Sequence, residues 1–124
     1  PYQKELQDKF GLNCYGCCEP VDLRWDYIKQ IRNLRRISVS PWSNEELMAE
    51  LLGDDYIYSR KPPSTWLACE NADEEMMEAA IRKTVSLAGR NLELIMKDNH
   101  TIGNNPNNCI RYVQVCRRVI NDMC

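Results

Sequence analysis

The stretch RISVSPWSNEELMAELLGDDYIYSR, residues 36–60, contains a strand, a helix and a second strand. Residues 36–40 and 56–59 each have the length and composition of a short strand. Between them, Ser43 and Glu46 have the spacing of a capping box, so a helix is expected to begin there. Two strands joined through one helix by short connections indicate a parallel pair.

The same alternation extends over the whole chain. Helices are predicted at 1–10, 21–33, 43–52, 73–89 and 105–124, and strands at 12–17, 36–40, 56–59 and 92–96. The last helix is expected to bury one apolar face, formed by Ile110, Val113, Cys116, Ile120 and Met123. We therefore predict an α/β fold in which four βα units with a parallel sheet form half of a (β/α)8 TIM-type barrel. A length of 124 residues predicts one domain.

The side chains of each predicted strand alternate between two faces. The face expected to meet the helices carries Leu12, Cys14, Ile37, Val39, Ile57, Leu92, Leu94 and Met96. The opposite face carries Asn13, Tyr15, Cys17, Ser38, Ser40, Tyr56, Tyr58, Arg60, Glu93, Ile95 and Lys97. Parallel strands buried on both sides are normally apolar throughout. A polar second face therefore predicts a polar barrel interior or ligand cavity, with a solvent-exposed face of a two-layer sheet as the alternative.

Composition excludes several classes of protein. The chain has 16 basic and 18 acidic residues, a net charge of −2, and no basic stripe, so nucleic acid is not an expected partner. No apolar run approaches the roughly 18 residues of a membrane span, and none is predicted. With 44% apolar and 27% charged residues, a packed globular core is expected.

Seven cysteines are many for this length, and their number is odd. Three of them, Cys14, Cys17 and Cys18, fall within five residues, which is poor spacing for a disulfide framework. We expect free thiols in a reducing compartment, and hence a cytoplasmic protein. Most of these cysteines are expected to act as small buried apolar residues.

Reactive side chains follow the predicted strands. In parallel α/β folds the active site gathers at the carboxyl ends of the strands. Four clusters fall there: Cys17, Cys18 and Glu19; Ser40 and Trp42; Arg60 and Lys61; Lys97, Asp98, Asn99 and His100. The predicted substrate-binding residues are Tyr15, Trp42, Arg60 and Lys61, and the two cations would clamp substrate carboxylates. A solvated pair at a strand end is the alternative for those cations.

Thiols and the single histidine at this rim suggest a metal. Cys17, Cys18 and His100 are ligand types suited to zinc, and three ligands with an open position would make a catalytic site. Each residue also has a structural alternative. His100 would be a loop histidine bonded to backbone, and Glu19 a carboxylate at a helix N-terminus.

Four runs together resemble a known superfamily. They are LNCYGCCEP (12–20), RRISVSPW (35–42), DYIYSRKPPS (55–64) and LELIMKDNHTIGNNP (92–106). In this order and spacing they resemble the C-terminal half of uroporphyrinogen-decarboxylase-like proteins, a superfamily that includes corrinoid-dependent methyltransferases. The resemblance covers nearly the whole chain and is specific as a set rather than run by run.

The two branches of the superfamily map differently onto these residues. The methyltransferases close one strand with a zinc-binding H-x-C, and here Tyr15-Gly16-Cys17 takes that place without the histidine. Their later cysteine falls near Asn99 or His100. The decarboxylases carry a histidine between glycines before a Pro-started helix. His100-Thr101 with Pro106 resembles that turn without the glycines.

The resemblance favours a partial enzyme domain of the zinc- and corrinoid-dependent methyltransferase-like branch. It implies zinc at Cys17, Cys18 and His100, catalytic roles for Glu19, Lys97, Asp98 and His100, a small-molecule substrate, and a corrinoid on a partner protein. One alternative is a uroporphyrinogen decarboxylase fragment, although the catalytic Asp of those enzymes comes from an N-terminal half that is not in this chain. The other is a non-catalytic half-barrel that binds a ligand or assembles with a partner chain.

Half of a barrel leaves two strand edges unpaired. An eight-stranded barrel buries every edge, whereas four strands alone expose both outer strands and one face. We therefore expect a homodimer or a complex with a separate N-terminal half.

Overall fold

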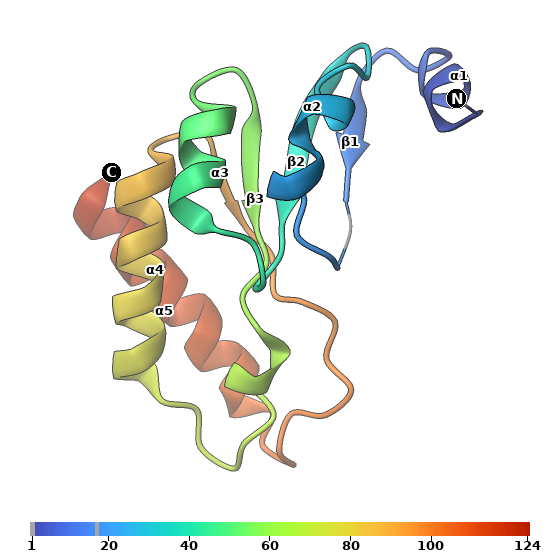
Figure 1. The fold of residues 1–124 in the computed structure, drawn as a ribbon. Coiled ribbons are helices and arrows are strands. Elements are labelled where there is room, and N and C mark those ends of the chain that lie inside the picture. Colours follow the sequence, from blue (N-terminus) through green and yellow to red (C-terminus); the bar gives the residue numbers. More distant parts are fainter. Residues whose placement is uncertain (1, 17) are drawn as a thin grey trace.

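The computed structural model describes residues 2–16 and 18–124, and it is an α/β fold with an all-parallel sheet in the order β1-β2-β3-β4 (Figure 1). The strands are β1 (Asn13–Tyr15), β2 (Leu34–Val39), β3 (Ile57–Arg60) and β4 (Leu92–Leu94). The helices are α1 (Tyr2–Gln7), α2 (Trp25–Ile28), α3 (Glu45–Leu52), α4 (Glu74–Ala88) and α5 (Asn107–Met123), with 3-10 turns η1 (Asp22–Arg24) and η2 (Ser64–Trp66). The predicted half of a TIM-type barrel, with alternating strands and helices, is confirmed.

Helix ends follow local chemistry. Asp73 caps α4 by accepting a hydrogen bond from the Met76 amide at 3.0 Å. The expected capping box of α3 is shifted by one residue. Asn44, not Ser43, accepts from the Leu47 amide at 3.0 Å. The hydroxyl of Ser43 lies 3.2 Å from that of Ser40 instead.

Several predicted elements, among them the second helix and the fourth strand, are shorter than expected. The helix predicted at 21–33 is the turn η1 followed by a single turn of α2, and Asn33 takes a left-handed conformation with φ 55°. β4 ends at Leu94, yet the Ile95 amide still donates to the Arg60 carbonyl at 3.0 Å. Among the described residues, no helix is long and apolar enough to cross a membrane.

The hydrophobic core lies on one face of the sheet. Directly opposed residues of parallel strands share a face, and Tyr15, Ile37, Tyr58 and Leu92 form one row across all the strands. Ile37 and Tyr58 are buried among residues of α2 and α3, while Leu92 also packs against the cluster of α4 and α5. Both core clusters are therefore on the helix-covered face.

The predicted assignment of faces was wrong in part. Tyr15, Tyr58 and Arg60 were expected on the polar face, and their register places them on the helix-covered face. Cys14 and Ile57 were expected against the helices and instead share a row with Arg36 on the other face. The register shifts between Asn13 and Cys14 in β1. In β3, Tyr58 donates to the Glu45 carbonyl and Arg60 to the Glu45 carboxylate, so their polar atoms have partners on the helix side.

The predicted buried face of α5 was also wrong. Cys116 is buried, but Ile110, Val113, Ile120 and Met123 are 39–55% exposed. The residues of α5 that face the core are Asn108, Tyr112, Val115, Cys116 and Val119. The helix thus has a second apolar surface that this chain leaves uncovered.

The Asn108 side chain joins the loop that follows β3 to the loop that follows β4 through hydrogen bonds. This fully buried side chain accepts from the Ala72 amide at 3.1 Å. Its amide nitrogen lies 2.7 Å from the Cys69 carbonyl, and 3.3 Å from both the Leu67 and Ile102 carbonyls. Next to it, Gly103 has φ 61°, and a Cβ there would lie 1.9 Å from the Cys69 oxygen.

We predict that Asn108→Ala lowers the free energy of unfolding by about 2–3 kcal/mol, because it leaves several buried backbone groups without a partner. Urea denaturation followed by circular dichroism measures the change. Asn107→Ala is the matched control, since Asn107 is the exposed neighbouring residue and its loss should change stability little. Equal stabilities of the two variants would contradict the role of Asn108.

Candidate functional site

The face of the sheet opposite the helices carries a row of small and polar residues. Ser38, Ser59 and Glu93 lie directly opposite one another on β2, β3 and β4. Gly16 continues the row beyond β1, because a Cβ at Gly16 would lie 3.5 Å from that of Ser38. The row therefore has little side-chain volume except at Glu93.

An ion pair spans this face. Arg36 on β2 donates from Nε to the Glu93 carboxylate on β4, reaching across β3. Burial would raise the pKa of Glu93, but the neighbouring Ser59 hydroxyl and the Arg36 guanidinium outweigh it and lower that pKa below its ordinary value. The Lys61 charge acts in the same direction. The carboxylate is thus held ionised and its charge is matched locally.

Two lysines continue this face at the carboxyl ends of the strands. Backbone pairing extends to both, since the Lys61 amide donates to Val39 at 2.9 Å and the Lys97 amide to Pro62 at 3.4 Å. By the alternation of side chains, Lys61 follows Ser59 and Lys97 follows Glu93 on the same face. The Lys97 ammonium lies 3.8 Å from Asp98, and its side chain is 23% exposed. These cations border the row of small residues.

The Ser38 and Ser59 hydroxyls of this face make no hydrogen bond to another described residue. Ser38 is 1% exposed, and its oxygen makes no hydrogen bond within residues 2–16 and 18–124. A buried hydroxyl without a partner is unfavourable by about 1–3 kcal/mol. The Ser38 hydroxyl therefore keeps an unused donor just beneath this face.

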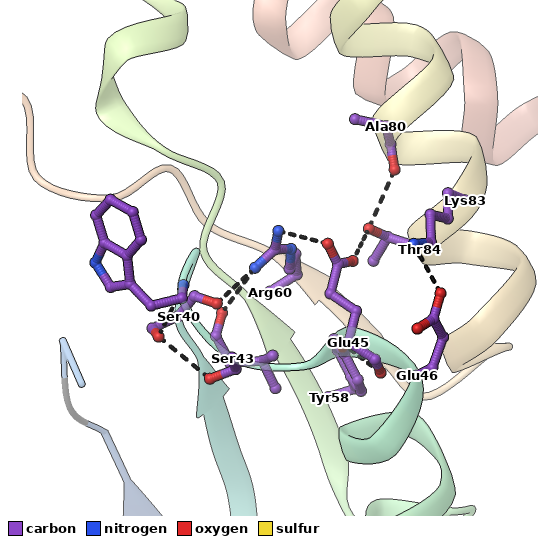
Figure 2. A network of polar contacts seen from close by, with 11 residues as sticks. Ser40, Ser43, Glu45, Glu46, Tyr58, Arg60, Ala80, Lys83 and Thr84 are labelled. Atoms are coloured by element: carbon purple, nitrogen blue, oxygen red, sulfur yellow. Dashed lines mark hydrogen bonds and ion pairs between the residues drawn. The ribbon is translucent and has the colours of Figure 1, made fainter. Parts of the chain in front are cut away.

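The predicted substrate-binding Arg60 lies on the helix-covered side (Figure 2). Its guanidinium donates at 2.7 Å to both the Ser40 carbonyl and Glu45 Oε1. The second Glu45 oxygen accepts from the Thr84 hydroxyl at 2.7 Å. Arg60 thereby joins the carboxyl ends of β2 and β3 to α3 and, through Glu45, to α4.

The other predicted substrate-binding residues are not gathered with Arg60. Tyr15 is half-buried and lines a groove between α1 and α2 on the helix side. Trp42 is 71% exposed, and its amide donates to the Ser40 hydroxyl at 3.3 Å. Lys61 is on the polar face described above, with predicted catalytic residues Lys97 and Asp98 at the end of the neighbouring strand.

The predicted metal ligands are only partly described. Cys17 lies outside the described residues, and Cys18 and His100 are both exposed. Glu19 forms an exposed ion pair with Arg24 at 2.8 Å. In residues 2–16 and 18–124, no three His, Cys, Asp or Glu side chains are grouped so that they could hold a metal ion.

Comparison with protein-family models, curated proteins and solved structures finds no match. The sequence placed Ser38 and Glu93 on the polar face but gave no reason to single out Arg36 or Glu45. The partners Arg36–Glu93 and Glu45–Thr84 are 57 and 39 residues apart, so local spacing carries no signal for them.

Removing the Arg60 charge tests its structural role. Arg60→Met should lower the free energy of unfolding by about 3 kcal/mol, because the half-buried Glu45 carboxylate would lose its cation. The matched control is Lys83→Met, which breaks the exposed Lys83–Glu46 pair and should shift the urea midpoint little. A midpoint for Arg60→Met equal to that of the control would show that the Arg60 pair is not needed for folding.

Proposed function

We propose that this chain is the ligand-binding half of a (β/α)8-type barrel, and that its polar sheet face binds a small anionic molecule. The observation that carries this proposal is the buried, unpartnered Ser38 hydroxyl beside a row of small residues. Interior layers of such barrels are normally filled by bulky branched side chains. In this layer Gly16, Ser38 and Ser59 have small side chains instead, which favours a ligand in the completed barrel over a fully packed interior.

The charges of this face favour an anion. Arg36 matches the Glu93 carboxylate, so Lys61 and Lys97 supply the remaining positive charge nearest the carboxyl ends of the strands. The exposed Asp98 offsets Lys97 only from 3.8 Å. Once a second half covers the face, excluded water would strengthen each charge-assisted hydrogen bond. A carboxylate between the two ammonium groups, with Ser38 donating to a second ligand group, satisfies these donors.

The chemistry of the completed barrel is a further part of the proposal. The resemblance to uroporphyrinogen-decarboxylase-like proteins supports an enzyme whose remaining catalytic groups come from the other half. Its methyltransferase-like branch needs zinc and a corrinoid carried by a partner protein, and the exposed Cys18 at the carboxyl end of β1 favours that branch. The decarboxylase branch and binding without catalysis share the same ligand face. No reaction step is assigned to the residues described.

Carboxylate binding can be measured directly. We expect succinate to bind, and Lys61→Met and Lys97→Met each to weaken it by about tenfold or more, because each removes a charged hydrogen bond. Two-dimensional NMR titration reports both affinity and location. Succinamide, the neutral analogue, should not bind, and Lys83→Met is the control because Lys83 is paired with Glu46 on the helix side. Shifts that ignore both lysines would contradict the proposed site.

Zinc content tests the methyltransferase-like branch. Protein purified without chelator should contain about one zinc ion per chain, lost in His100→Ala while the fold is retained, since an exposed loop histidine contributes little packing. Plasma emission spectrometry gives the metal content, and circular dichroism checks the fold. Protein that contains no metal even when it is prepared in the presence of zinc would count against this branch. It would leave the ligand-binding proposal in place.

A further inference from the structure

Helix α5 has one apolar surface buried and a second uncovered. Tyr112, Val115 and Val119 face the core. Val113 and Ile120, one heptad apart, are 45% and 39% exposed. A helix that is apolar on two sides is typical of one packed between two neighbours.

The uncovered flank points past the edge of the sheet. Arg118 binds Glu78 at 2.8 Å and Asp122 binds Arg82 at 2.6 Å, so α4 lies along one flank of α5. At 100° per residue, Val113 and Ile120 project from the opposite flank. The helices α3, α4 and α5 pack in the order of the strands they follow. The apolar flank therefore faces the space beyond β4, which is an edge strand.

At the other edge, a groove is open beside β1. It has a volume of about 370 Å³ and lies between α1 and α2, with Tyr15, Tyr27, Ile28 and Ile31 in its wall. Tyr27 is 79% exposed. Figure 1 shows α1 standing beyond β1, away from the other helices. In a ring of alternating strands and helices, the helix that follows the preceding strand would occupy this position.

We propose that a second copy of this chain completes the barrel, with α5 of each copy lying in the groove between α1 and α2 of the other. A two-fold axis along the barrel makes both contacts at once and sets β4 of each copy parallel to β1 of the other. A net charge of −2 per chain opposes this pairing little. The inference rests on the proposed function, because it takes the polar face as a barrel interior, and it names the second copy as the partner.

Sedimentation velocity of the full chain tests this interface. Wild-type protein should be a dimer at micromolar concentration. The double variant Val113→Glu/Ile120→Glu should raise the dissociation constant by about 100-fold or more, because symmetry places the buried charges at both contacts. Tyr27→Lys should do the same from the groove side. Ile110→Glu is the control. Ile110 is 55% exposed but projects away from the contact between α5 and the groove, so this variant should remain a dimer.

Mixing the two disrupted variants sharpens the test. A heterodimer of the Tyr27→Lys chain and the Val113→Glu/Ile120→Glu chain has one wild-type contact and one Lys–Glu contact, so dimers should reappear. Circular dichroism confirms that each variant is folded. A wild-type monomer, or a dimer unaffected by these variants, would overturn the inference. The succinate titration is a separate readout. Lysine-dependent binding by a monomer would contradict this interface and leave the ligand site in place. A dimer that does not bind succinate would contradict the ligand site and leave the interface in place.

Discussion

The rest of this structure depends on one constraint: helices cover the parallel sheet on one face only. The connections from β1 to β4 are all parallel crossovers, and the core residues of the sheet lie on a single face. The opposite face carries a charged pair, buried serines and lysines in place of the apolar side chains that a two-sided sheet would have. This arrangement is the one expected of a barrel interior with its second half removed.

Polar contacts fix the carboxyl ends of the strands, where the proposed ligand would bind. Arg60 and Glu45 fix the start of α3 to the ends of β2 and β3, and Asn108 fixes the loops beyond β3 and β4 to each other. Arg60 and Asn108 are buried and Glu45 is half-buried, so these contacts limit the movement of the backbone from which Lys61 and Lys97 project. Binding to a preorganised edge avoids the cost of ordering loops.

Much of the fold could be predicted from sequence because its signals are local. The alternation of elements, the cap at Asp73 and the helix-ending Gly53 and Gly89 follow from neighbouring residues. The faces of β3 could not be predicted. Tyr58 and Arg60 look polar in sequence, yet Tyr58 is 2% exposed and donates to the Glu45 carbonyl, while Arg60 is paired with the Glu45 carboxylate. Their burial depends on a partner 13 and 15 residues away along the chain, beyond the reach of strand periodicity.

The candidate site, too, could be predicted from the sequence only in part. Lys61 and Lys97 were predicted from their place after strands, whereas the Arg36–Glu93 pair required the tertiary structure. The apolar stripe of α5 was recognised in sequence but assigned to the core of this chain. Periodicity identifies an apolar surface without saying whether the cover comes from the same chain or another.

Closure of the sheet into a barrel is tested most directly by amide hydrogen exchange at the two outer strands. In the proposed assembly, β1 and β4 gain backbone partners when the barrel forms, while β2 and β3 are already paired on both sides. Exchange measured by mass spectrometry at increasing protein concentration should therefore slow in peptides covering β1 and β4 and stay constant in those covering β2 and β3. Fast exchange of the outer strands at every concentration, with the inner strands protected, would contradict a closed barrel.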